Sequence, residues 1–196
     1  MNNLSNKILI YDALSSTSTL LKSMAREGAE DGTVIISKVQ TGGRGRLGKS
    51  FFSPEGGLYL SYLMHPKTLP EETAEITMCT GAVVRRVIGE QCGIWADIKY
   101  VNDLLYNGKK LCGILAELIE GNLIIGIGIN VNNKAEVFPP ELRDIVISIS
   151  DILGEDVSPA ELHLPLISAL NDLNSTWPNC KKNLLDEYLK YCCTNF

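Results

Sequence analysis

The segment DLLYNGKKLCGILAELIEGNLIIGIGINV, residues 103–131, consists of three apolar runs separated by two short turns. Asn107 and Gly108 form the first turn, and Gly121 lies in the second. Both Asn and Gly tolerate the positive φ angles of a type I′ turn, so this pair between apolar runs is a strong local signal for a β-hairpin. The segment therefore predicts strands over residues 103–106, 111–118 and 123–131, joined by hairpins.

Further apolar runs flank this segment and predict additional strands over residues 8–11, 33–39, 58–64 and 94–100. Apolar residues at helical spacing predict helices over residues 19–27, ended by Gly28, and over residues 70–91, ended by Gly93. The order of elements favours an α+β fold, a mixed β-sheet with helices packed mainly on one face.

The pattern beyond Pro139 and Pro140 is helical. Residues 158–161 (SPAE) form a predicted capping box with proline at the first helical position. Pro165 is expected to kink or delay this helix, because proline lacks the backbone N–H. A last helix is predicted over residues 184–191.

Length and composition indicate an ordinary globular protein. The 196 residues are 45% hydrophobic and 21% charged, which predicts a single domain over residues 1–196 that buries about 70% of its unfolded surface. The apolar runs are interrupted by Gly and far shorter than the roughly 20 residues of a membrane span. The polar start, residues 1–7, is not typical of a secretory signal, so we expect a cytoplasmic protein.

Charge and cysteine spacing exclude several other classes. The net charge of −5 argues against a general nucleic-acid-binding surface. The six cysteines form no C-x-x-C pair, and the chain has only two histidines. Structural zinc and a disulfide framework are therefore not expected, and the cysteines are predicted to be free thiols.

A glycine-rich basic loop stands out in this acidic chain. Residues 37–53 contain four basic residues and no acid, with the basic residues at Lys38, Arg44, Arg46 and Lys49. Glycines at 42, 43, 45 and 48 would let backbone N–H groups approach an anion closely. The loop therefore predicts a local phosphate or carboxylate site, and a solvated surface loop is the alternative.

Two familiar nucleotide-binding patterns match the sequence of this loop but not the structure that they require. Residues 43–50 match G-x-x-x-x-G-K-S, and Gly43, Gly45 and Gly48 match G-x-G-x-x-G. Both patterns require a helix immediately afterwards, whose N-terminus binds phosphate. Residues 51–57 (FFSPEGG) contain one proline and two glycines, so we predict no helix there.

Four motifs together resemble the biotin–protein ligases. Residues 40–49 (QTGGRGRLGK), with SP at 53–54 and GLYLS at 57–61, are similar to the biotin-binding loop and following strand of that family. STS at 16–18 is similar to the family's Ser-Thr-Asn. KYVND at 99–103 is similar to its Lys-Trp-Pro-Asn-Asp, and KLCGILAE at 110–117 is similar to its Lys-Leu-x-Gly-Ile-Leu-x-Glu. GIGINVN at 126–132 is similar to its Gly-x-Gly-Ile-Asn strand. The chain is identified as a member of this family, whose catalytic fold is that of class II aminoacyl-tRNA synthetases.

The resemblance implies an activity. Such ligases join biotin to ATP as biotinyl-5′-AMP, release pyrophosphate, and transfer biotin to one lysine of a biotin carboxyl carrier domain of a biotin-dependent carboxylase. It therefore implies biotin, ATP and Mg²⁺ as ligands and the carrier domain as partner. The reaction brings two anions together, so the site must supply positive charge.

The resemblance also implies roles for individual residues. Lys110 would contact both the biotin carboxylate and the α-phosphate, and Arg44 and Arg46 would hold the loop over the adenylate. The implied biotin contacts are Ser16, Thr17, Ser18, Gln40, Gly43, Arg44, Gly45, Arg46 and Lys110. The implied ATP contacts are Arg46, Lys49, Asn102, Asp103, Lys110 and Asn130, and Asn102 would also bind Mg²⁺ indirectly.

Simpler interpretations exist for the same residues. Residues 16–18 could cap the first helix, Lys110 could be a solvated residue beside a hairpin, and Asn102, Asp103 and Asn130 could form turns. Ser18 replaces the family's asparagine, so its contact with biotin is expected to be shorter or water-mediated.

The two ends of the chain differ from many relatives. A strand at residues 8–11 leaves no room for the N-terminal winged helix of the ligases that also act as repressors, so DNA binding is not expected. Residues 187–191 resemble the last helix before the family's C-terminal β-barrel, and the chain then ends. An apolar face left there could be covered by a homodimer.

Three other functions compete with the ligase. A lipoate–protein ligase shares the fold, but its usual Arg-Arg-x-Ser-Gly-Gly-Gly loop differs from residues 41–48. A biotin-binding module without transfer would not need Arg44, Arg46 and Lys110. A nucleic-acid-binding loop would be expected to carry interleaved aromatic residues, which residues 42–50 lack.

Overall fold

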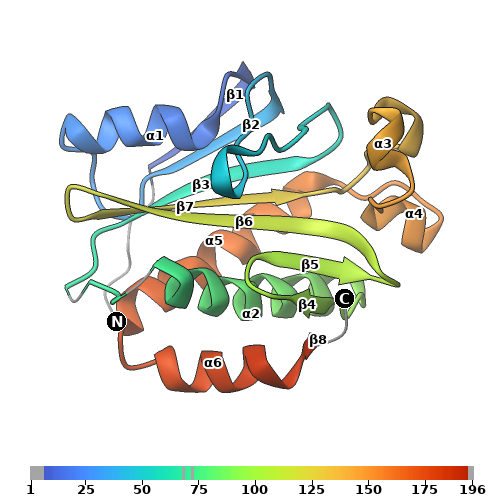
Figure 1. Cartoon of the computed structure of the whole chain (residues 1–196). Helices are drawn as coiled ribbons and strands as arrows, with labels where there is room; N and C mark the ends of the chain where they lie inside the picture. Colours follow the sequence, from blue (N-terminus) through green and yellow to red (C-terminus); the bar gives the residue numbers. More distant parts are fainter. Residues whose placement is uncertain (1–6, 68, 72, 194–196) are drawn as a thin grey trace.

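The centre of the protein is an eight-stranded mixed sheet (Figure 1). The computed structural model describes residues 7–67, 69–71 and 73–193. In sheet order the strands are β1 (Ile8–Leu14), β2 (Val34–Gln40), β3 (Leu58–Met64), β7 (Asn122–Ile129), β6 (Lys109–Ile119), β5 (Asp103–Tyr106), β4 (Asp97–Lys99) and β8 (Cys192–Cys193). The β1–β2 and β4–β8 pairs are parallel and the others are antiparallel.

The two predicted hairpins are confirmed. Asn107 and Gly108, between β5 and β6, have φ angles of 50° and 78°. Glu120 and Gly121, between β6 and β7, have φ angles of 50° and 83°. Two successive positive φ angles are those of a type I′ turn, whose twist matches that of the flanking strands. The Glu120–Gly121 turn fixes the β6–β7 register, in which Gly113 lies opposite Gly128.

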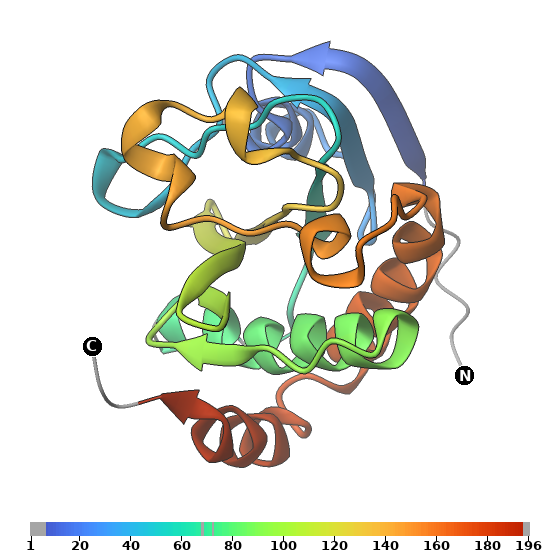
Figure 2. The ribbon, with the colours of Figure 1, turned by 90° about the vertical axis from the view of Figure 1, so that its right-hand side faces the viewer.

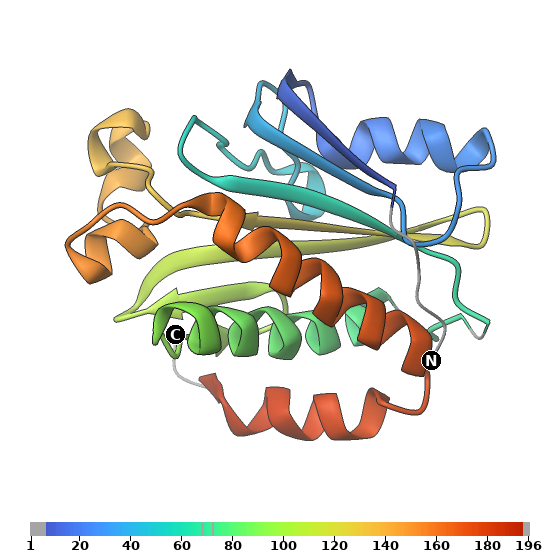
Figure 3. The same ribbon diagram turned by 180° about the vertical axis from the view of Figure 1, so that it is seen from behind.

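Helices lie on both faces of the sheet, most of them on one. Their bounds are α1 (Thr17–Arg26), α2 (Thr73–Cys92), α3 (Pro140–Arg143), α4 (Ile149–Leu153), α5 (Pro159–Thr176) and α6 (Lys181–Lys190). Figure 3 shows α2 and α5 side by side over one face, with α6 beyond α2. Helix α1 is the exception and covers the opposite face, where Leu21 and Ala25 contact Ile35, Leu63 and Ile124.

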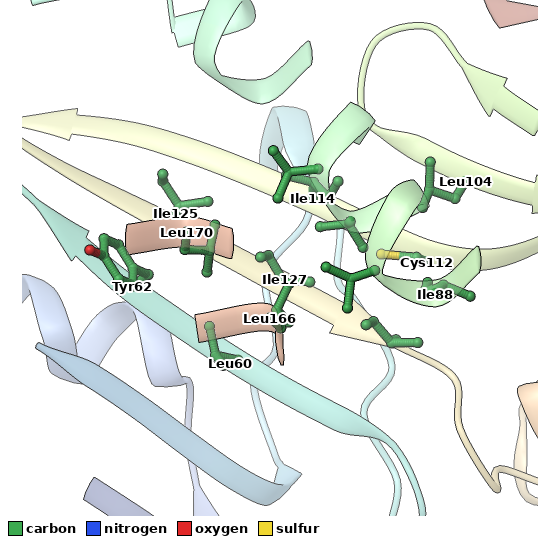
Figure 4. Close-up of a cluster of buried hydrophobic side chains, with 14 of the residues drawn as sticks. Leu60, Tyr62, Ile88, Leu104, Cys112, Ile114, Ile125, Ile127, Leu166 and Leu170 are labelled. Carbon is green, nitrogen blue, oxygen red and sulfur yellow. The ribbon is translucent and has the colours of Figure 1, made fainter. Parts of the chain in front are cut away.

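The main core lies between the sheet and the α2–α5 pair (Figure 4). Leu60 and Ile127 from the sheet contact Leu166 from α5, and all three are buried. Each buried CH₂ group contributes about 0.8 kcal/mol to folding. This core lies on one face of the sheet, and the opposite face, which carries α1, is not needed for it.

Several sequence predictions about helix ends need correction. Helix α1 begins at Thr17, two residues before the predicted start, because the Ser16 hydroxyl accepts a hydrogen bond from Thr19 N at 3.4 Å. Helix α5 begins at Pro159 as predicted and continues through Pro165 without delay.

The predicted capping box at residues 158–161 is wrong. Ser158 is the N-cap of α5, but its side chain makes no capping hydrogen bond. A capping box instead begins α4, where Ser148 and Asp151 bond to each other's backbone N–H groups. The last helix begins at Lys181, three residues before the prediction. No helix in the described part of the chain is long and apolar enough to cross a membrane.

Candidate active site

A pocket of about 250 Å³ opens on the α1 face of the sheet. Its floor is formed by strands β6 and β7, where Gly113, Gly126 and Gly128 point to this face. Gly126 and Gly128 have the same parity on β7 as Ile124, which contacts α1, and Gly113 lies opposite Gly128 on β6. Glycine inside a strand has no side chain, so another group can approach the backbone closely there. These three glycines therefore leave the space that forms the pocket.

The Phe51 ring lies on this glycine floor. A Cβ atom at Gly113 would lie 2.8 Å from the ring, and one at Gly128 would overlap it. The ring is edge-on to Tyr59, with centroids 6.4 Å apart. Burial raises the pKa of Tyr59, so its hydroxyl stays protonated and donates to Pro54 O at 2.7 Å. The floor is therefore aromatic and uncharged.

One side of the pocket, which we name the polar wall, consists of Ser16, Thr17, Ser18 and Gln40. Gln40 Oε1 accepts hydrogen bonds from Thr17 N at 2.9 Å and from Thr17 Oγ1 at 3.1 Å. Gln40 Nε2 donates to Ser53 Oγ at 2.9 Å, and Ser53 Oγ donates to Phe51 O at the same distance. Hydrogen bonds from both the helix and the loop thus fix the Gln40 side chain.

The loop over the pocket, residues 41–57, is tied to the sheet at both ends. At one end, Thr41 N donates to Leu14 O at 2.9 Å. At the other, Asn132 N donates to Gly56 O at 2.7 Å, and Asn133 Nδ2 donates to Glu55 O at 3.0 Å. Figure 2 shows this cyan loop beside the orange segment that carries α3 and α4. The middle of the loop lies between these two attachments.

The middle of the loop contains a single 3₁₀ turn, Arg46–Gly48, and no α-helix follows it. Gly45 N donates to Lys49 O at 2.7 Å, which closes this turn. Leu47 at its tip is 90% exposed and has a φ angle of 56°. The prediction that residues 51–57 contain no helix is therefore confirmed, and neither nucleotide-binding pattern has the helix N-terminus it needs.

Three basic side chains, Arg44, Arg46 and Lys49, form what we name the basic rim. They are exposed, and no carboxylate of the described residues lies within 4.0 Å of them. Lys110 lies deeper, with Nζ 2.8 Å from Asp103 Oδ1 and 5.4 Å from the centre of the Phe51 ring. Positive charge exceeds negative charge around the pocket, so it attracts anions.

Residues 10–133 match the model of the biotin/lipoate A/B protein ligase family. The chain belongs to this family. It is 39% identical over 159 residues to the bifunctional ligase/repressor BirA of Bacillus subtilis, covering 78% of this chain and 49% of that protein. It is 29% identical over 137 residues to the biotin–[acetyl-CoA-carboxylase] ligase of Mycobacterium tuberculosis, covering 67% of this chain and 52% of the relative. The chain therefore spans about half the length of these curated relatives.

The fold comparison agrees with the sequence comparison. A biotin protein ligase from Aquifex aeolicus, solved in complex with biotin and ATP, superposes with a TM-score of 0.85 and 30% identity. The match covers 95% of this chain and 78% of that one. The α+β class and the mixed sheet expected from the sequence are confirmed.

All the site residues implied by the family resemblance line the pocket except Gly43 and Asn130. Gly43 is a buried residue of the loop, and a Cβ atom there would overlap Phe51 O and lie 2.6 Å from Ser53 Oγ. Glycine at this position lets the loop backbone approach the Gln40–Ser53 pair. Ser16 serves both interpretations, since it caps α1 and lines the pocket.

Asn130, which the resemblance implies as an ATP contact, is not among the residues that line the pocket. It is buried behind β6, and its Nδ2 donates to Lys110 O at 3.2 Å and to Ile147 O at 3.3 Å. Lys110 N also donates to Ile145 O at 2.7 Å. The Asn130 amide thus holds the backbone that carries Lys110. Asn102 lines the pocket, and its Nδ2 donates to Ile114 O at 3.1 Å.

Sequence reasoning gave no role to several residues that shape the site. These are Phe51, Ser53, Ser61 and the three floor glycines. The glycines had a usable signal, because Gly126 and Gly128 alternate within an apolar strand. Cys112 lies next to Gly113 but faces the core, and burial raises its pKa, so it remains a neutral thiol.

Proposed function

We propose that this chain is an ATP-dependent biotin–protein ligase. The supporting observation is one pocket that combines the polar wall, the glycine floor and the basic rim with Lys110. Relatives named as biotin ligases, and the Aquifex aeolicus structure with biotin and ATP, support the same assignment. The proposed reaction forms biotinyl-5′-AMP with release of pyrophosphate and then biotinylates a lysine of a biotin carboxyl carrier domain.

The polar wall suits the ureido group of biotin. That group offers two N–H donors and one carbonyl acceptor, and the wall provides three hydroxyls and one carboxamide. Lipoate has a dithiolane ring that forms no comparable hydrogen bonds. Binding it would leave the lone pairs that the wall presents to the pocket without N–H donors from the ligand, which a polar site disfavours. We therefore favour biotin over lipoate as the substrate.

In the proposed first step, a biotin carboxylate oxygen attacks the α-phosphorus of ATP. The bond from that phosphorus to the bridging oxygen breaks, and pyrophosphate leaves with the electron pair. Lys110, Arg44 and Arg46 would balance the negative charge of the two reacting anions. The ion pair with Asp103 and the backbone bonds around Lys110 hold its ammonium group in place.

In the proposed second step, the amine of a carrier lysine attacks the acyl carbon of the adenylate. The acyl C–O bond breaks, AMP leaves, and the amine loses a proton as the amide forms. The Mycobacterium tuberculosis relative is named for acetyl-CoA carboxylase, so we propose a carrier of that class as the partner.

We propose that Mg²⁺ enters this site together with ATP, as part of the substrate. The pocket fits a metal held mainly by phosphate oxygens and water, since Asp103 is its lining carboxylate and is paired with Lys110. Among the described residues no three His, Cys, Asp or Glu side chains form a metal-binding group. Asn102, at the pocket, would act on the metal indirectly.

We further propose that residues 1–196 act as one catalytic domain in the cytoplasm without binding DNA. The family match over residues 10–133 and the net charge of −5 support this proposal. The homodimer stays a prediction.

The test is biotin-dependent release of pyrophosphate from Mg·ATP by the purified chain. Lys110→Ala is expected to reduce the rate by about 100-fold or more, because it removes a charge at the reacting anions. Lys109→Ala is the matched control, because Lys109 precedes Lys110 in β6 and is exposed. Biotin binding without pyrophosphate release would contradict the ligase and indicate a binding module, and release with lipoate would indicate the other branch of the family.

A further inference from the structure

Ser61 is fully buried on β3, behind the polar wall, and does not line the pocket. Its Oγ lies 2.8 Å from Thr17 Oγ1 and 2.9 Å from Ser18 Oγ. Two pocket-lining hydroxyls thus share one partner that a ligand does not reach. The direction of these two hydrogen bonds decides what the wall presents to a ligand.

The direction is fixed at one end by a backbone group. Thr17 N can only donate, so the Gln40 atom that faces it is the carbonyl oxygen Oε1. Thr17 Oγ1 lies 3.1 Å from the same oxygen. That oxygen can only accept, so the single hydroxyl hydrogen of Thr17 points to Gln40.

The remaining directions follow from counting hydrogens. Because the Thr17 hydrogen is already donated to Gln40, its oxygen must accept from Ser61 Oγ. The Ser61 hydrogen is then used, so Ser61 must accept from Ser18 Oγ. The series runs in one direction from Ser18 through Ser61 and Thr17 to Gln40. Ser18 and Thr17 therefore present lone pairs, and no free hydrogens, to the pocket.

The sheet is shaped around this series. A Cβ atom at Gly126 would lie 2.8 Å from Ser18 Oγ and 3.8 Å from Ser61 Oγ. A side chain at position 126 would therefore displace the Ser18 hydroxyl from Ser61. The absence of a side chain there lets the two hydroxyls meet at the floor of the pocket.

We propose that Ser61 is a positioning residue that makes the hydroxyls of Thr17 and Ser18 act as acceptors, so that the wall selects a ligand edge bearing N–H donors. This inference rests on the proposed function, for which the matching edge is the ureido N–H of biotin. Without Ser61, the Ser18 hydrogen is free to turn toward the pocket and oppose that N–H. Ser61 thus acts on biotin affinity and not on the adenylation step.

The experiment measures two quantities for each variant. Calorimetric titration with biotin, without ATP, gives Kd, and pyrophosphate release gives kcat and the KM values for biotin and ATP. Ser61→Ala is expected to raise the Kd and KM for biotin about tenfold, the effect of one lost hydrogen bond to a buried partner. The kcat and the KM for ATP are expected to change less than about twofold. A general distortion of the site would change all four.

Two further variants separate the hydroxyl from its volume. Ser61→Thr keeps the hydroxyl on a residue that strands accommodate well, and is expected to restore biotin affinity to within about threefold of the original. Ser61→Cys keeps the approximate size but donates weakly, and is expected to resemble Ser61→Ala. If Ser61→Ala does not fold, comparison of the biotin Kd of Ser61→Thr and Ser61→Cys tests whether the hydroxyl at position 61 sets biotin affinity.

The matched control is Ser37→Ala. Ser37 is a buried serine on β2 that donates to Val39 O at 2.7 Å and lies outside the series. Its loss is expected to leave the Kd for biotin unchanged. Biotin affinity equal to the unsubstituted chain in both Ser61→Ala and Ser61→Cys would overturn the inference, as would equal losses in Ser37→Ala and Ser61→Ala.

Failure of the inference and failure of the proposed function differ in readout. If the unsubstituted chain binds biotin but releases no pyrophosphate, the ligase proposal fails, and the Kd series still supports or overturns the role of Ser61. If pyrophosphate is released normally and Ser61 substitutions do not change the Kd, only the inference fails. An unsubstituted chain that binds no biotin overturns both.

Discussion

The polar wall and the basic rim face the same pocket but differ in how their polar groups are satisfied. The wall residues are buried or half-buried: Ser16 bonds to Thr19 N, and the other three bond to one another, to Ser53 and to Ser61. The rim residues Arg44 and Arg46 are exposed, with no carboxylate of the described residues within 4.0 Å. A preorganised surface loses little entropy on binding, whereas solvated cations lose more and respond to the charge of the ligand. The wall is therefore suited to recognition, and the rim to holding the charged reactants.

Gly43→Ala is expected to have the largest effect, because Gly43 joins the rim to the wall. A Cβ atom there would overlap Phe51 O, which is backbone, and press on Ser53 Oγ. Pyrophosphate release should fall more than about 100-fold, since steric insertion of this kind costs about 1–3 kcal/mol and also misplaces Gln40. Gly42→Ala is the control, because its Cβ would meet Ser15 O at 3.3 Å, and its loss should be much smaller. Equal losses would contradict the specific role of Gly43.

Arg46→Ala tests the rim alone. The kcat/KM for pyrophosphate release should fall about 10- to 100-fold, because a cation beside the transferring phosphate is removed. The melting temperature should not change, because the side chain is exposed and has no ion pair among the described residues. Arg46→Lys keeps the charge without the planar fork and should recover part of the loss. A fall in melting temperature would show that Arg46 contributes to the fold.

Salt should separate the two surfaces further. Raising ionic strength from ~0.05 M to ~0.3 M shortens the Debye length, so the KM for ATP should rise about threefold as the exposed rim cations are screened. The Kd for biotin should rise less, because the wall hydrogen bonds are buried. Steady-state kinetics and titration at matched salt give both values. Equal salt dependence would contradict the division into wall and rim.

The features that could be predicted from the sequence are those decided by residues that are close together in the chain. The hairpin at Asn107–Gly108 and the end of α2 at Gly93 were readable, because local backbone preferences decide them. Each of these two signals lies within a few residues of the feature it predicts. Gln40 and Lys110 are 70 positions apart in the sequence, and the family resemblance, not a local pattern, suggested that they share a site; both line the same pocket.

Features built from distant segments were not readable. Asn130 ends a motif strand, but its partner Ile147 belongs to a segment that no local pattern pairs with it. Strand β8 has two residues, too short for any periodicity. The spacing of Ser158 and Glu161 fits a capping box, but the Ser158 side chain makes no capping hydrogen bond. The capping box forms instead at Ser148 and Asp151. Tertiary contacts decided the first two features, whereas the Ser148–Asp151 box is local and its spacing was a signal present in the sequence.

Leu47→Asn is expected to have the smallest effect. Leu47 is at the tip of the loop with a left-handed backbone that asparagine adopts more readily. Its side chain is 90% exposed, so pyrophosphate release should change less than about twofold. Leu47→Val is the contrasting control, because a β-branched residue disfavours this conformation, and it should raise the KM for ATP more than Asn does. A large loss in Leu47→Asn would mean that the leucine side chain itself contacts a reactant.

The double attachment of the loop has a consequence for how the pocket meets its ligand. The bonds from Thr41, Asn132 and Asn133, together with the bond from Phe51 N to Gly43 O, leave residues 44–50 between the attachments. The entropic cost of ordering the loop is therefore confined to that stretch, at about 1–2 kcal/mol per residue for a fully mobile backbone. The attachments also keep Arg44 and Arg46 beside the pocket that they line. Their effective concentration over the pocket stays high before any ligand arrives.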